Sequence, residues 1–174
     1  MADLSRTVGR FQAAERTFCR WCNRRSRPTL KMLKWISKLG DGSVWVACSS
    51  LPVLAGRPDG WRLAGLMVGG TALNIGVYSL IKRKTTRQRP FLTLPDITLL
   101  ERPLDRYSFP SGHTMHAAFF AALLPQHMPI TAWLLWPFAA LIAASRVSLG
   151  LHYPTDVAAG AALGLLMAGF FLTL

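Results

Sequence analysis

Long apolar runs limit how this chain of 174 residues can fold more than any other feature of its sequence. The clearest of them cover Trp61 to Ile81, Pro129 to Ala144 and Pro154 to Leu174. A helix needs roughly 20 apolar residues to cross the hydrocarbon core of a bilayer, and inside lipid every backbone polar group must find a partner within the protein. The runs therefore predict membrane-spanning helices and argue against an ordinary soluble domain.

Two shorter apolar runs, Ser43 to Ala55 and His113 to Leu124, extend this pattern. The first is short for a span and crosses only if it borrows the preceding turn or tilts little. Counting both, we predict an all-α fold, a polytopic membrane helix bundle with about five spans. Small residues such as Gly65 and Gly69 allow close helix packing, either within one chain or between two, so a homo-oligomer is left open.

The first 41 residues are strongly basic, with ten Lys and Arg side chains, and the whole chain has a formal net charge of +12. Such a charge suits nucleic acid or an anionic membrane surface, and the long apolar runs favour the membrane, so no nucleic-acid partner is expected. Apolar residues recur three to four positions apart between the charges, with a break near Pro28. This spacing predicts amphipathic helices that lie in the interface against anionic headgroups; a solvated basic tail is the alternative. We therefore divide the chain into a basic amphipathic interfacial segment, residues 1–41, and a transmembrane domain, residues 42–174.

The cysteines predict neither a disulfide framework nor a metal site. Cys19 and Cys22 form a lone CxxC, and with Cys48 they are the only cysteines in the sequence. A zinc site needs a second pair or a suitable histidine, so packing on a helix face explains the CxxC better, and we expect no bound metal. No secretory signal peptide is expected, because the first apolar run comes too late in the chain.

A polar segment, residues 145–156, separates the last two apolar runs and contains Arg146, His152 and Asp156. Arginine offers a planar fork of donors to phosphate oxygens, and histidine is a nucleophile at neutral pH. An aspartate four residues later can hold the imidazole in one tautomer. Pro154 suits a first helical turn, which would place His152 beside a helix N-terminus where an anion is favoured. The alternative is that Asp156 only caps the helix dipole, Arg146 reaches a headgroup and His152 is incidental.

Two further stretches carry polar groups at the ends of apolar runs. Pro110-Ser111-Gly112-His113 directly precedes an apolar helix, so that Ser111 can donate, the backbone at Gly112 can approach an anion, and His113 lies in the first turn. Lys82 to Pro90 ends the run that begins at Trp61. A basic cluster in that place is by default flanking charge on the cytoplasmic side, which is how we interpret Arg83, Lys84 and Arg87.

The spacing of these residues resembles the three-part signature of the type 2 phosphatidic acid phosphatase (PAP2) superfamily. That superfamily includes membrane lipid phosphatases, bacterial non-specific acid phosphatases and vanadium haloperoxidases. The matching positions are Lys82 with six residues before Arg89-Pro90, then Pro110-Ser111-Gly112-His113, then Ser145-Arg146 with five residues before His152 and three more before Asp156.

The resemblance implies a catalytic role for the domain 42–174. By similarity to the family, His152 attacks phosphorus to form a phosphohistidine, Asp156 orients its ring, and His113 protonates the leaving oxygen before water releases phosphate. His116, one turn after His113, is interpreted as structural or adjacent to the site. The phosphate oxygens would be held by Lys82, Arg89, Arg146, Ser111 and the amide of Gly112. Three cations can neutralise the charge that Mg²⁺ neutralises elsewhere, so neither metal nor cofactor is expected.

The function we predict is that of a metal-independent membrane lipid phosphatase. Candidate substrates are phosphatidic acid, phosphatidylglycerol phosphate, and polyprenyl phosphates or diphosphates such as undecaprenyl diphosphate. Alternatives are a lipid phosphotransferase and a non-catalytic basic membrane scaffold; a haloperoxidase is disfavoured because that branch is soluble. Two spans precede Lys82, so the basic N-terminus and the site share a side, and the positive-inside bias predicts the cytoplasmic face of a bacterial inner membrane.

Overall fold

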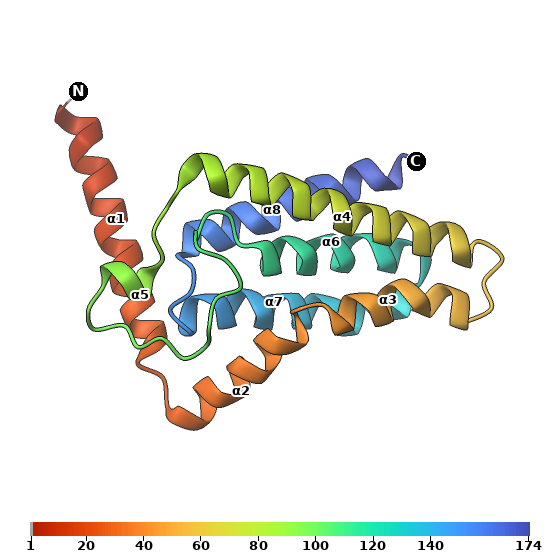
Figure 1. Cartoon of the computed structure of the whole chain (residues 1–174), viewed down its shortest axis with the longest axis horizontal. Helices are drawn as coiled ribbons and strands as arrows, with labels where there is room; N and C mark the ends of the chain where they lie inside the picture. The colour runs from red at the N-terminus through yellow and green to blue at the C-terminus, as the bar shows by residue number, and fades with distance from the viewer. Residues whose placement is uncertain (1) are drawn as a thin grey trace.

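The computed structural model describes residues 2–174, and within that range the chain is helical without any β-strand (Figure 1). The predicted all-α fold is therefore confirmed. The helices are α1 (Ala2–Asn23), α2 (Arg27–Leu39), α3 (Ser43–Leu54), α4 (Gly60–Thr85), α5 (Pro90–Thr93), α6 (Gly112–His127), the 3-10 helix η1 (Pro129–Thr131), α7 (Ala132–Ser148) and α8 (Pro154–Leu172).

Within the described residues 2–174, three helical segments are long and apolar enough to cross a membrane. They are Gly60–Thr93, Pro129–Ser148 and Pro154–Leu172. The 12 residues of α3 and the 16 residues of α6 are fewer than a span of ordinary tilt requires. The polytopic membrane bundle is thus supported by three spans, while the count of about five stays a prediction.

Helix α6 lies at the centre of the bundle, between α4, α7 and α8 (Figure 1). Its residues Phe119 and Phe120 are completely buried. Helix α8 approaches it closely because two glycines face it: a Cβ at Gly160 would lie 2.4 Å from the carbonyl oxygen of Ser111, and one at Gly164 would lie 2.2 Å from that of Met115. Glycine permits this separation since it adds no side chain between the two backbones.

The same close packing gathers the polar motifs at one end of the bundle. The amide of Ser111 donates to the carbonyl oxygen of Asp156 at 2.9 Å, which joins the start of α6 to the start of α8. Helices α4 and α7 end near the same place, and Gly150, with φ +76°, turns the chain from α7 towards α8. Two helix N-termini and two helix C-termini therefore surround one small volume.

The basic segment forms α1 and α2, which lie at this same end (Figure 1). The predicted break falls at residues 24–26, since Ser26 caps α2 and Pro28 occupies its first turn, where its missing N–H costs no hydrogen bond. On α1, Phe11 and Trp21 are exposed, whereas Glu15 is buried. The predicted division at residue 41 falls in the turn between α2 and α3, and α2 packs against α7 of the second part; the division stays a prediction.

Candidate active site

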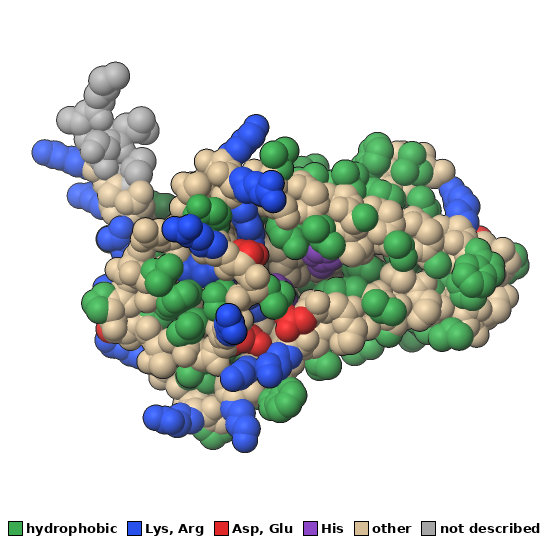
Figure 2. Space-filling view, in the orientation of Figure 1, with side chains coloured by type: hydrophobic (Ala, Val, Ile, Leu, Met, Phe, Trp, Pro, Cys, Tyr) green, Lys and Arg blue, Asp and Glu red, His purple; other side chains and the backbone are tan. Residues whose placement is uncertain are grey.

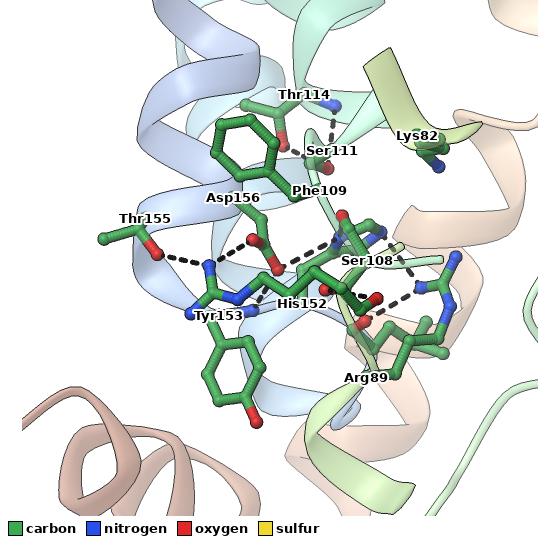
Figure 3. Close-up of polar contacts among 12 residues, drawn as sticks. Lys82, Arg89, Ser108, Phe109, Ser111, Thr114, His152, Tyr153, Thr155 and Asp156 are labelled. Carbon is green, nitrogen blue, oxygen red and sulfur yellow. Dashed lines mark hydrogen bonds and ion pairs between the residues drawn. The ribbon is translucent and has the colours of Figure 1, made fainter. Parts of the chain in front are cut away.

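Six of the eight residues predicted for the site line one cavity of about 700 Å³. They come from the end of α4, the residue before α5, the start of α6, the end of α7 and the loop before α8. Ser111 and Asp156 do not line the cavity, but Ser111 precedes Gly112, which does, and Asp156 lies beside His152 (Figure 3). The six lining residues are Lys82, Arg89, Gly112, His113, Arg146 and His152.

The hydrogen bonds of His152 determine its tautomer. Its Nδ1 lies 2.6 Å from the carbonyl oxygen of Ser108, and its Nε2 lies 3.2 Å from NH1 of Arg89 (Figure 3). A carbonyl oxygen only accepts and a guanidinium only donates, so the ring carries its proton on Nδ1 and a lone pair on Nε2. Nε2 is therefore the atom that can attack an electrophile in the cavity.

The surroundings of His152 keep this ring neutral. Its side chain is 1% exposed. Burial, followed by the positive charges of Arg89 and Arg146, lowers the pKa of His152 well below its ordinary value. A neutral imidazole at physiological pH is the form that a nucleophile requires.

Asp156 lies beside this ring, but it does not hold the ring by itself as the sequence predicts. Its Oδ2 is 3.7 Å from Nδ1 of His152 and accepts a hydrogen bond from the amide of Tyr153 at 2.8 Å. The carbonyl oxygen of Ser108 accepts the hydrogen bond from Nδ1–H of His152 instead. The reason is that Asp156 occupies the first turn of α8, where its carboxylate satisfies a free amide of that helix.

The three predicted cations surround the cavity in different states of pairing. Lys82 Nζ and Arg89 NH2 both bind Asp105, at 2.6 and 2.8 Å. Arg146 donates to the hydroxyl of Ser37 and lies 3.7 Å from Glu101. Among the described residues, the Nε atoms of Arg89 and Arg146 have no hydrogen-bond partner although they are buried. Both side chains line the cavity, where the guanidinium groups present donors that suit an anion.

The motif at the start of α6 has two faces. His113 lines the cavity, and its Nε2 lies 2.6 Å from a carboxylate oxygen of Asp41, in the turn between α2 and α3. Ser111, predicted as a phosphate donor, caps α6: its hydroxyl bonds that of Thr114 at 3.0 Å and accepts from the Thr114 amide. A buried helix start needs such an acceptor, which explains why this side chain faces away from the cavity.

His116 and the cysteines are placed as structural groups. Nδ1 of His116 lies 2.9 Å from the carbonyl oxygen of Gly112, and the side chain forms part of the cavity wall. Cys19 and Cys22 are buried in a small apolar cluster with Leu94 and Val147, and burial raises the pKa of Cys19 to about 12. Within residues 2–174, no cluster of three metal-ligating side chains occurs.

Sequence reasoning missed three charged residues that contact the predicted ones directly, Arg87, Asp41 and Asp105, and it missed Glu15, which binds Arg87. Arg87, interpreted as flanking charge, binds Asp156 at 2.6 Å and Glu15 at 2.8 Å. Asp41 contacts His113, and Asp105 binds both Lys82 and Arg89. Their partners are separated by 16 to 72 positions in the sequence, so no local spacing signals these contacts.

Comparison with known proteins gives the same picture. The chain is 38% identical over 129 residues to a decaprenylphosphoryl-5-phosphoribose phosphatase from Mycolicibacterium smegmatis, and 32% identical over 134 residues to an undecaprenyl-diphosphatase from Sulfolobus acidocaldarius. These alignments cover 72% and 76% of this chain but only 67% and 64% of the relatives, and another curated relative is covered over 40% of its length.

The fold is similar to a solved structure, the transmembrane PAP2-type phosphatidylglycerolphosphate phosphatase from Bacillus subtilis. The TM-score is 0.75 at 26% sequence identity, covering 94% of this chain and 85% of that one. Residues 63–174, which contain all three motifs and most of the cavity wall, match the model of the PAP2 superfamily. The chain is therefore a member of the PAP2 superfamily.

Proposed function

We propose that the protein is an integral membrane lipid phosphatase that cleaves a phosphomonoester or diphosphate headgroup through a phosphohistidine. One observation carries this proposal: His152, whose Nε2 accepts a hydrogen bond from Arg89, lines the same cavity as Lys82, Arg89 and Arg146. A neutral nucleophile beside several cations is what phosphoryl transfer requires, since its catalysis is mostly positioning and charge stabilisation.

The reaction would proceed in two displacements. Nε2 of His152 forms a bond to phosphorus as the bond to the lipid oxygen breaks, and His113 gives its proton to that oxygen. Lys82, Arg89 and Arg146 stabilise the equatorial oxygens, with the backbone at Gly112 beside them. Water then attacks the phosphohistidine, passes a proton to His113 and releases phosphate, which restores the neutral Nε2.

The shape of the cavity supports a lipid as substrate. It continues from the polar end as a groove between α3 and α4, and one face of α4 lines it at every third or fourth residue. From Trp61 to Lys82 this face is about 31 Å long at 1.5 Å per residue, close to the hydrocarbon thickness of a bilayer. Val46, Leu54 and Trp61 are 71 to 80% exposed along it. An acyl or prenyl chain would cover this apolar surface while the headgroup reaches His152.

The candidate headgroups follow from the site and from the relatives. Phosphatidic acid, phosphatidylglycerol phosphate and polyprenyl phosphates or diphosphates each join a phosphate to a long apolar chain. The named relatives act on polyprenyl and glycerolipid phosphates, so both tail classes belong in the test.

The test is phosphate release by the detergent-purified protein from each of these lipids in the presence of EDTA. We expect release that His152→Ala abolishes and that His127→Ala leaves unchanged, because His127 ends α6 at the opposite end of the bundle. Undiminished release by His152→Ala would refute the histidine mechanism. Consumption of lipid without free phosphate would show the phosphotransferase, and no consumption by the folded protein would favour the scaffold.

A further inference from the structure

A carboxylate of α1 reaches the back of the candidate active site. Glu15 is buried, and its Oε1 accepts hydrogen bonds from the amide of Thr155, at 3.0 Å, and from the hydroxyl of the same residue. Its Oε2 accepts from NH2 of Arg87 at 2.8 Å. Thr155 lies in the first turn of α8, where a carboxylate satisfies free amides and is stabilised by the helix dipole. Glu15 therefore attaches α1 to the turn that follows His152.

Arg87 is held on three sides by this arrangement. Its NH1 donates to Oδ1 of Asp156 at 2.6 Å and to the hydroxyl of Thr155 at 2.7 Å, while NH2 donates to Oε2 of Glu15. Its guanidinium also lies 4.2 Å from the centre of the Tyr153 ring. These partners fix the orientation of the planar Arg87 guanidinium. The guanidinium in turn fixes the position of the Asp156 carboxylate that is bonded to it.

Asp156 in turn faces the proposed nucleophile. With Oδ1 on Arg87 and Oδ2 on the amide of Tyr153, the carboxylate cannot rotate, and Oδ2 stays 3.7 Å from Nδ1 of His152. When His152 bonds to phosphorus its ring gains positive charge, so the position of this buried carboxylate affects the transition state. Glu15 and Arg87 do not line the substrate cavity; they lie behind Asp156.

We propose that Glu15 and Arg87 are positioning residues that act through Asp156 on His152, so that α1 supplies part of the catalytic centre. This inference rests on the proposed function of His152. Arg87 occupies one of the six unspecified positions between Lys82 and Arg89 in the first motif, and Glu15 lies outside the matched residues 63–174.

Steady-state kinetics of Arg87→Met, Arg87→Lys and Glu15→Gln test the proposal. We expect Arg87→Met to lower kcat roughly 10–100-fold, the loss expected when a reacting group shifts by up to 1 Å. KM should stay within about twofold, because neither residue touches the substrate cavity. Arg87→Lys should recover part of kcat, since a lysine keeps a positive charge next to the carboxylate of Asp156. Glu15→Gln should lower kcat less, and the double variant Glu15→Gln/Arg87→Met should lose less than the two single losses combined, because the residues act as one chain.

A second ion pair of α1 provides the matched control. Arg20 binds Asp96 at 2.9 Å on the surface, away from Asp156. Arg20→Gln removes an attachment of α1 without touching the chain of contacts to His152, so its kcat should equal that of the wild type. Equal losses in Arg20→Gln and Glu15→Gln would show that α1 only contributes to stability and would overturn the proposal.

A spectroscopic measurement separates this inference from the proposed function. In ¹⁵N-histidine-labelled protein, which has four histidines, the Nδ1 proton of His152 is held by Ser108 beside Asp156. Its signal should shift in Arg87→Lys and Glu15→Gln and stay in place in Arg20→Gln. If the signal moves but the wild type releases no phosphate, the proposed function fails alone. If the wild type is active while neither the signal nor kcat changes in these variants, the positioning role fails alone.

Discussion

Asp105 shows how a single residue affects access to the site. It comes from the loop between α5 and α6, and its two oxygens bind the two cations Lys82 and Arg89, which the proposed mechanism assigns to phosphate. Burial by itself would raise the pKa of Asp105, but these two cations hold it below its ordinary value. The side chain is therefore ionised at neutral pH, and a phosphate must displace it to reach the same donors.

Replacing this carboxylate should expose the phosphate-binding donors. We expect Asp105→Asn to lower the inhibition constant of inorganic phosphate by roughly tenfold. While Asp105 is bound to Lys82 and Arg89, these donors are not available to phosphate, so the apparent affinity for phosphate falls in proportion to the fraction of molecules in that state. Asp96→Asn is the control, since Asp96 lies in the same loop but binds Arg20 outside the cavity. Competitive inhibition by phosphate measures both variants. Weaker inhibition of Asp105→Asn than of the wild type would show that Asp105 supports phosphate binding instead.

Among the elements, the pair α6 and α8 sets the geometry of the site. Both helices begin there, and the bond from the Ser111 amide to the Asp156 carbonyl fixes their relative height. Their separation depends on Gly160 and Gly164, where a side chain would collide with backbone oxygens of α6. The distance between the first turns, and hence between His113 and His152, therefore depends on residues one to two turns further into the bundle.

A methyl group at this contact should disturb both stability and catalysis. Gly164→Ala places a Cβ 2.2 Å from the carbonyl oxygen of Met115, so we expect a loss of about 1–3 kcal/mol in the free energy of unfolding. Gly169→Ala, on the same helix, meets no atom within 4 Å and should be neutral within about 1 kcal/mol. Unfolding in detergent measures both. Equal stability of the two variants would show that the contact tolerates a wider spacing.

At the scale of the whole molecule, charge is concentrated at one end of the bundle. In Figure 2 the Lys and Arg side chains gather over α1, α2 and the loops beside the site, while apolar side chains cover much of the remaining length. At the opposite end, the turn between α3 and α4 contributes Arg57 and Asp59, and the first turn of α4 contributes Arg62. This asymmetry favours placing the site, together with the basic α1 and α2, at the cytoplasmic face against anionic headgroups.

This orientation predicts the location of the C-terminus. Helix α8 begins at the site and ends at the far end of the bundle, so Leu174 should lie on the extracytoplasmic side (Figure 1). A reporter fused after Leu174 that is active only outside the cytoplasm should therefore be active, and one that is active only inside should be silent. The reverse result would place the site on the outer face and would require another explanation for the basic end.

Local sequence was sufficient for the all-α fold, the family and the six motif residues that line one cavity. Apolar runs predict spans because lipid offers no partner to backbone groups, and the three motifs identify the family because each is a short segment with its own spacing. The break near Pro28 was also predicted correctly, since Pro acts on the backbone around it. These features depend on neighbours within a few positions, and they include the six residues that line the cavity.

The pairing of those residues was decided only by the tertiary structure. The carbonyl of Ser108 accepts a hydrogen bond from His152, which is 44 positions away in the sequence, and Glu15 accepts one from Thr155, which is 140 positions away. Ser111 faces away from the cavity because a buried helix start must be capped, a requirement visible only once α8 covers it. Charged and polar groups interact through space at distances that chain spacing does not determine. The sequence by itself therefore determined six of the residues that line the cavity, whereas tertiary packing added Arg87, Glu15, Asp41 and Asp105 and decided what each group binds.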